Sequence, residues 1–158
     1  MSDASAPEFS ISTDAGKLDV AWIVHSVLDA YWGGHLAGAQ IRAALQESLV
    51  FGAYNERREP MNLSPHAPKA EWVHSRQIGF VRVVTDGAIF SSVTDVLVAP
   101  EHRNKGVGSA LMREVIAHPG VAGTICILAS RPEAWSWYQN FGFVLVDRKS
   151  GIMQRQPT

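Results

Sequence analysis

Apolar residues recur at helical spacing in three segments of the chain. The first begins after Asp19 and ends at the glycines of "YWGGHLAG", and the second spans about 39–47. Apolar residues at every third or fourth position form one face of a helix, so both segments are predicted to be helical. The same spacing over 107–116 predicts a third helix that ends at "HPG". Pro132 suits the first turn of a fourth helix, which runs to about Asn140.

Apolar runs of strand length stand between these helices. Asp86-Gly87 is a strong turn dipeptide and joins two β-branched segments into a hairpin. The continuous run "TICILAS" (124–130) is typical of a strand that is covered on both faces. The remaining predicted strands are "FSISTD" (9–14), "LVFGAY" (49–54), "FVLVDRK" (143–149) and "GIMQRQ" (151–156). The pattern predicts a mixed α/β or α+β fold, with a sheet of about six to seven strands flanked by four helices.

One segment, 55–77, follows neither period. It reads "NERREPMNLSPHAPKAEWVHSRQ" and combines three prolines with mixed charge. A structureless loop of this length is uncommon inside a compact domain and usually has a function. The rest of the chain shows no internal repeat and no domain boundary. We therefore expect a single domain over 1–158 with an extended loop at 55–77.

Composition narrows the class of protein. The chain has 158 residues, of which 46% are hydrophobic and 18% charged, as in a soluble globular domain. The net charge of -1, without a run of Lys or Arg, argues against nucleic-acid binding. The chain has no apolar run long enough to span a bilayer, and its start, "MSDASAPEFS", lacks the apolar core of a secretion signal. The single cysteine, Cys126, lies in an apolar run and is expected to be a buried packing residue, which fits a cytoplasmic location.

The stretch "PEHRNKGVGSALM" (100–112) raises the question of nucleotide binding. A phosphate-binding loop of the NTPase type needs Gly-Lys followed by Ser or Thr, which the chain does not supply. A dinucleotide fingerprint needs a third glycine at the position that Leu111 occupies. Neither nucleotide motif is therefore present.

What remains is Arg103 followed by Gly106 and Gly108, between a predicted strand and a predicted helix. Backbone N–H groups at a helix N-terminus favour anions, and glycines let a phosphate approach them closely. Arg103 and Lys105 add positive charge beside these groups. The motif alone fits a phosphate cradle and an ordinary chain turn equally well.

In its context the motif resembles the central signature of the GCN5-related N-acetyltransferase (GNAT) family. That signature is a strand, then Arg or Gln, two residues, Gly, one residue and Gly or Ala, then a helix. "VLVAPEHRNKGVGSALM" (96–112) matches it, and "WYQNFGF" (137–143) resembles a second family signature. The predicted element order follows the family's fold from about Phe9 to Phe143. The segment at 55–77 departs from it, because the family usually has a shorter turn there.

The resemblance implies acetyl-CoA as the donor and no metal. Backbone groups at Leu97 and Val98 would pair with the pantetheine arm, and Asn140 would also contact coenzyme A. Arg131 stands where many family members carry Asn. The residues implied in binding the pyrophosphate are Arg103, Asn104, Lys105, Gly106, Val107, Gly108 and Ser109.

The resemblance also implies two catalytic candidates. Tyr138 matches the family's usual acid, and its alternative role is that of a core aromatic. Asp95 would act as the base or would anchor a neighbouring loop. Regular strand alternation predicts Val93, Asp95 and Leu97 on one face of the sheet, opposite Val96 and its neighbours.

Acceptor recognition is expected from the loop that contains Tyr31, Trp32 and His35, although the two aromatic residues could equally cap the core. The implied function is acetyl transfer to a primary amine by direct attack. A non-catalytic acyl-CoA-binding regulatory module and an unrelated nucleotide-binding protein are the alternatives. The expected partner is a small-molecule or peptide amine, with neither nucleic acid nor membrane, and a homodimer is a possible assembly. Near-neutral charge does not identify the acceptor.

Overall fold

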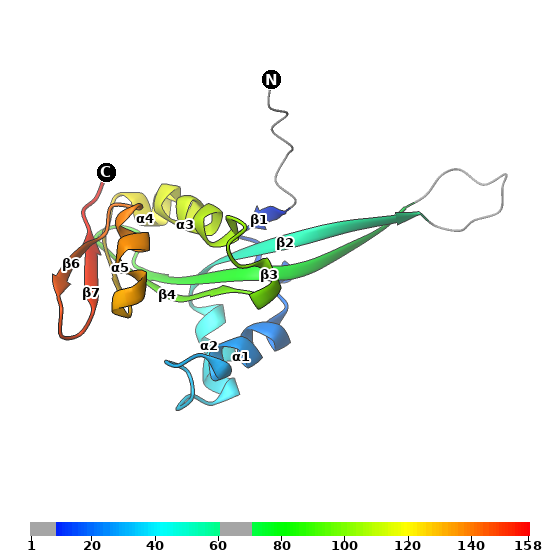
Figure 1. Ribbon diagram of the computed structural model, residues 1–158, viewed down its shortest axis with the longest axis horizontal. Helices are drawn as coiled ribbons and strands as arrows, with labels where there is room; N and C mark the ends of the chain where they lie inside the picture. Colours follow the sequence, from blue (N-terminus) through cyan, green and yellow to red (C-terminus); the bar gives the residue numbers. More distant parts are fainter. Residues whose placement is uncertain (1–8, 61–70) are drawn as a thin grey trace, which may run out of the picture.

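A computed structural model describes residues 9–60 and 71–158 and shows one seven-stranded sheet (Figure 1). The strand order is β1-β2-β3-β4-β5-β7-β6, and neighbours are antiparallel except for the parallel pair β4 and β5. This arrangement confirms the predicted mixed sheet. The strands are β1 Ser10–Ser12, β2 Leu49–Pro60, β3 Glu71–Thr85, β4 Phe90–Val98, β5 Ile125–Ala129, β6 Val144–Asp147 and β7 Ile152–Arg155.

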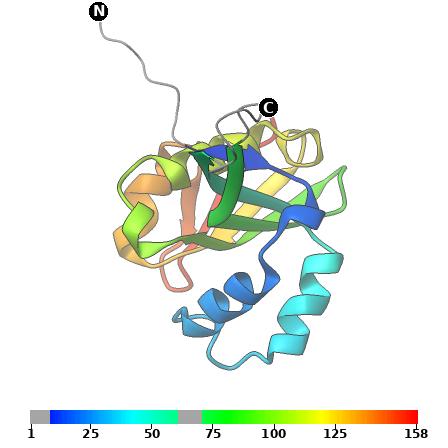
Figure 2. The same ribbon diagram turned by 90° about the vertical axis from the view of Figure 1, so that its right-hand side faces the viewer.

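Helices cover both faces of the sheet. Figure 2 shows α1 and α2 together beneath the sheet, with α3 and α5 on its other face. The four predicted helices are confirmed, and a short fifth helix, α4, occupies the segment where only a stop was expected. The helices are α1 Val20–Asp29, α2 Gly38–Gln46, α3 Val107–Ala117, α4 Pro119–Ala122 and α5 Pro132–Gln139, with 3-10 turns η1 Ala15–Lys17 and η2 Pro100–His102. Among residues 9–60 and 71–158, no helix is long and apolar enough to cross a membrane.

The core has one apolar cluster on each face of the sheet. The α3 side is filled by residues such as Phe51, Leu111 and Phe143, and the α1–α2 side by residues such as Ile23 and Phe80. Cys126 is fully buried on the α3 side, as predicted. The prediction that "TICILAS" is covered on both faces is wrong, because Ile125 is 38% exposed. The helices α1 and α2 lie against β2, β3 and β4 and do not reach β5.

The prediction of a structureless loop at 55–77 is also wrong for the residues that the structure describes. Strands β2 and β3 continue as a paired ribbon from Tyr54↔Gln77 to Pro60↔Glu71. Figure 1 shows this ribbon extending well beyond the helices. Pairing between strands needs only backbone hydrogen bonds, so a ribbon with no helix over it carries no apolar period. Residues 61–70 of the predicted loop lie outside the described residues.

Strand β4 is irregular in two ways, by a bulge and by its limited pairing with β5. Arg82 pairs with Thr94 but Phe80 pairs with Leu97, so Asp95 and Val96 together face a single residue of β3. This pattern is a β-bulge, and the backbone of Asp95 within it is left-handed, with φ 46°.

The bulge overturns the predicted alternation along β4. Val93 packs on the α3 side together with Val96 and Val98, whereas Leu97 packs on the α1–α2 side. In addition, β4 pairs with β5 only from Phe90 to Ser92, so the two strands separate beyond that point.

Candidate active site

Two adjoining cavities open where β4 and β5 separate. The first, of about 840 Å³, lies between the end of β4, the start of α3, and helices α1 and α5; we call it the β4–α3 cavity. The second, of about 730 Å³, lies between β4, the end of β5 and the start of α5; we call it the β4–β5 cavity. The residues that line both are Tyr31, Trp32, Val96, Ala134 and Tyr138. These shared residues lie where the two cavities adjoin.

The glycine-rich turn before α3 forms one wall of the β4–α3 cavity. Gly106 caps the helix with φ 81°, and a Cβ built there would meet no atom within 4 Å. The cavity is thus lined by the first residues of α3, where the helix dipole favours an anion. The predicted residues that line this cavity are Leu97, Val98, Arg103, Asn104, Gly106, Val107, Gly108 and Ser109.

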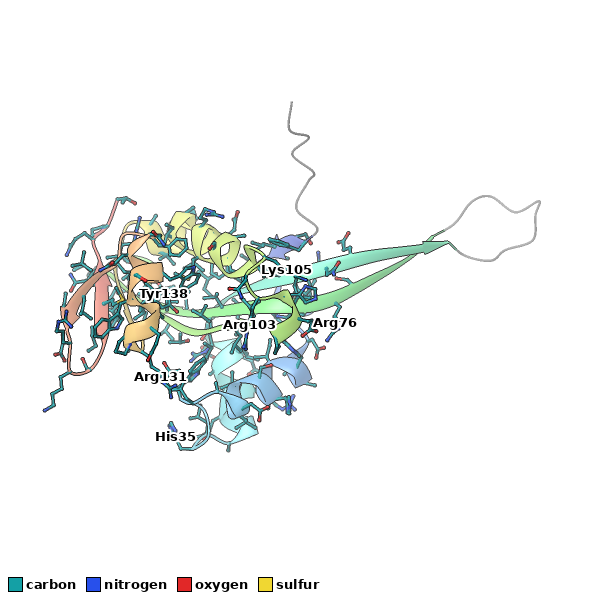
Figure 3. The ribbon with its side chains drawn as sticks, viewed as in Figure 1. His35, Arg76, Arg103, Lys105, Arg131 and Tyr138 are labelled. Atoms are coloured by element: carbon teal, nitrogen blue, oxygen red, sulfur yellow. The ribbon has the colours of Figure 1, made fainter. Side chains whose placement is uncertain are left out.

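Side chains hold this turn in place. Arg103 donates from Nε to the carbonyl oxygen of Val98 at 3.1 Å, which ties the turn to the end of β4. Trp137 donates from Nε1 to Oγ of Ser109 at 3.3 Å, and its ring lies 3.3 Å from where a Cβ of Gly108 would stand. Lys105, which Figure 3 labels beside Arg103, does not line either cavity.

Tyr138 lies at the junction of the two cavities. It is only 9% exposed, and its ring packs edge-on against Trp137 and Phe143. Burial, followed by the nearby Tyr31 phenol, raises the pKa of Tyr138 to about 12. The side chain therefore belongs to the core and also borders both cavities, and its hydroxyl stays protonated throughout the neutral range.

Asp95 lines the β4–β5 cavity, but both of its oxygens are already engaged. Oδ1 accepts a hydrogen bond from Nε1 of Trp32 at 3.0 Å, and Oδ2 accepts one from Nε of Arg82 at 2.6 Å. Arg82 in turn donates from Nη1 to Oγ of Ser48 at 3.2 Å. The carboxylate thus joins the loop after α1 to strand β3, and Arg82 extends this link to Ser48, the residue before β2.

The loop after α1 forms the wall shared by the two cavities. Gly33 allows the tight turn there, because a Cβ would stand 1.8 Å from the carbonyl oxygen of Val27. Tyr31 and Trp32 pack edge-to-face with 4.8 Å between ring centroids. His35, which was predicted beside them and is labelled in Figure 3, is exposed and lines neither cavity. Asn140, at the C-terminal end of α5, is also exposed and lines neither cavity.

The sequence reasoning missed several groups at the site. Trp22, His25, Ser26 and Asp29 of α1 line the β4–α3 cavity, and their spacing of three or four residues was the available signal. Arg82 and the role of Arg131 were also missed. Within the part of the chain that the structure describes, no cluster of three or more His, Cys, Asp or Glu side chains could hold a metal ion.

Comparison with known proteins identifies the family. A crystal structure from Xanthomonas campestris pv. campestris, described as belonging to the GNAT family, is 32% identical to this chain with a TM-score of 0.71. The match covers 89% of this chain and 87% of that one. The chain belongs to the GNAT family. The family profile described as "Acetyltransferase (GNAT) domain" matches residues 69–145, which include both GNAT signatures.

Two curated relatives add to this assignment. A Gibberella zeae protein that carries an acetyltransferase name is 31% identical over 109 residues, or 67% of this chain. "GCN5-related N-acetyltransferase 1, chloroplastic" of Arabidopsis thaliana is 30% identical over 110 residues, also 67% of this chain. The chain matches 61% of the first relative's length and 47% of the second's. The resemblance to the GNAT family inferred from the two motifs is thus confirmed.

Proposed function

We propose that this protein transfers an acetyl group from acetyl-CoA to a primary amine by direct attack. The observation that carries the proposal is the position of Tyr138, whose side chain borders both cavities. One cavity has an anion-binding helix start, as a donor with a pyrophosphate requires. The other is also lined by residues that the first lacks, such as Asp95 and Arg131, and we assign it to the acceptor.

The β4–α3 cavity fits acetyl-CoA in two respects. The turn from Arg103 to Ser109 offers backbone N–H groups and a guanidinium to a pyrophosphate. Among the residues that the structure describes, none pairs as a strand with the edge of β4 that faces β5 beyond Ser92, so the backbone there can pair with an extended pantetheine arm. We therefore assign the pyrophosphate to the turn and the pantetheine arm to Leu97 and Val98.

Bound acetyl-CoA would supply an activated acetyl group as a thioester. The amine nitrogen bonds to the acetyl carbon, the carbon–sulfur bond breaks, and the amine releases a proton to solvent. Tyr138 donates its phenolic proton to the departing sulfur and regains one from solvent. The raised pKa of Tyr138, about 12, means that the phenol is protonated at neutral pH and has a proton to donate.

We assign Asp95 to anchoring rather than to accepting the proton of the amine. A general base needs a carboxylate lone pair that is directed at the amine. Both oxygens of Asp95 accept hydrogen bonds in this structure, from Trp32 and Arg82. Asp95 thereby holds Trp32 in the wall between the cavities.

The test is release of free thiol from acetyl-CoA, measured with a panel of amines. Wild-type protein is expected to release thiol with at least one amine, and Tyr138→Phe is expected to lower kcat by about 10²-fold or more while acetyl-CoA still binds. Tyr54→Phe is the matched control, since it removes another buried phenolic hydroxyl that lines neither cavity. Binding of acetyl-CoA without release on any amine would point to the regulatory module.

A further inference from the structure

Arg131 is one of the residues that line the β4–β5 cavity. It precedes α5, and its Cζ lies 3.4 Å from the centroid of the Tyr31 ring. Both residues line the cavity, and Figure 3 shows Arg131 below Tyr138 at the start of α5. A guanidinium stacked on an aromatic face is held in a fixed orientation by cation–π attraction.

The stack leaves the hydrogen-bonding edge of Arg131 available. Stacking occupies the faces of the planar guanidinium, whereas its N–H groups point outward in the plane. Among residues 9–60 and 71–158, no side-chain or backbone oxygen accepts a hydrogen bond from Arg131, and no carboxylate lies within 4.0 Å of it. An oriented guanidinium with a free edge matches a carboxylate, which it can bind with two parallel hydrogen bonds.

Other charges in the cavity do not compete for Arg131. Asp95 is paired with Arg82 at 2.6 Å. Glu133, the other acidic residue that lines the cavity, forms no ion pair with Arg131. A cavity with an acidic and a basic group that do not pair with each other suits a ligand that carries both an ammonium and a carboxylate.

The backbone that carries Arg131 is firmly anchored. The N–H of Ser130 donates to the carbonyl oxygen of Gly151 at 3.1 Å, and Nε1 of Trp135 donates to the carbonyl oxygen of Ser130 at 3.1 Å. Tyr31, on which Arg131 stacks, is close enough to Tyr138 to affect its ionisation. A carboxylate bound by Arg131 would therefore be held in a fixed position relative to Tyr138.

We propose that the acceptor is an amine that also carries a carboxylate, as in an amino acid, and that Arg131 binds this carboxylate. The proposal rests on the proposed acetyltransferase function and names the class of its acceptor. Arg131 is then a residue that determines specificity, while Tyr138 serves every acceptor alike.

The test compares acceptors that differ only in the carboxylate. L-amino acids, β-alanine and γ-aminobutyrate are each paired with their carboxamides, and kcat/KM is measured from thiol release. Wild-type protein is expected to prefer the acid in the best pair. Arg131→Gln should lower kcat/KM for that acid by about 10- to 100-fold and leave the amide within about two-fold, since a charge-assisted bond is lost only with the acid. Arg148→Gln is the matched control, because Arg148 lies 5.5 Å over Trp135 and lines neither cavity.

A second measurement does not depend on turnover. In the presence of coenzyme A, the preferred acid should raise the melting temperature of wild-type protein and of Arg148→Gln but not of Arg131→Gln.

The possible results separate the two proposals. Equal loss for acid and amide in Arg131→Gln would show that the stack on Tyr31 only braces the cavity, and the inference would be wrong. Acetylation of amides or plain alkylamines in preference to acids would also overturn it, while the acetyltransferase function would stand. If no amine of any kind releases thiol, the proposed function fails and the acceptor class with it.

Discussion

Nε1 of Trp32 donates a hydrogen bond to Oδ1 of Asp95 at 3.0 Å. The bond joins residues 63 positions apart in the chain and connects the loop after α1 to the bulge in β4. The bulge turns the Asp95 side chain toward that loop, where regular alternation would have pointed it elsewhere. One carboxylate thereby links β4, which borders both cavities, to the wall that the two cavities share.

If Asp95 anchors Trp32, then Asp95→Ala and Trp32→Phe should have the same kinetic effect. Both remove the hydrogen bond that positions the wall, so KM for the amine should rise several-fold while kcat changes little. Asp95→Ala should also lower the free energy of unfolding by about 1–3 kcal/mol, because Arg82 loses its charged partner. Steady-state kinetics and urea denaturation measure the two effects.

The double variant tests the same point. Asp95→Ala combined with Trp32→Phe should raise KM no further than either single change, since both remove the same hydrogen bond. If instead Asp95→Ala abolishes kcat and Trp32→Phe does not, Asp95 is the base.

Gly106 should be the glycine of the motif that tolerates alanine least. Its φ of 81° lies in the left-handed region, where a Cβ costs about 1–2 kcal/mol even though the space around it is open. Gly106→Ala should therefore reshape the turn, lower the melting temperature and weaken acetyl-CoA binding. Calorimetric titration with acetyl-CoA measures the affinity.

Gly123→Ala is the matched control for this change. Gly123 also has open space around its missing Cβ, but its φ is -83°, which alanine adopts freely. It should leave both stability and acetyl-CoA binding near the wild-type values. An equal loss of stability and of acetyl-CoA affinity in both variants would show that the left-handed backbone of Gly106 is not required.

Sequence patterns predicted most elements because those elements bury one face. The apolar stripe of α3 and the turn at Gly106 are local features, and both appeared where expected. The bulge at Asp95 and the ribbon beyond Tyr54 were missed, because each depends on pairing with a distant strand and changes no local period. The same limit applies to Arg131, whose contact with Tyr31 joins two loops far apart in the chain.

Cys126 should be unreactive in the folded protein. It is fully buried, and burial raises the pKa of its thiol, so little thiolate is present or accessible. Iodoacetamide should therefore leave the native protein unmodified and alkylate it fully in denaturant, as seen by mass spectrometry. Fast alkylation under native conditions would contradict the burial. Because Cys126 is the single cysteine, thiol detected in the activity assay then comes from coenzyme A alone.

The raised pKa of Tyr138 predicts how stability changes at alkaline pH. In the unfolded chain the phenol ionises near pH 10, whereas in the folded protein it keeps its proton up to a pKa of about 12. Between these values the folded state binds more protons, so stability is complete below pH 10 and declines as pH rises toward 12. Two pKa units correspond to about 2–3 kcal/mol. Tyr138→Phe keeps the ring but cannot ionise, and its free energy of unfolding should fall less steeply over this range. Urea denaturation of both proteins at a series of pH values measures the difference, and identical slopes would place the phenol in contact with solvent.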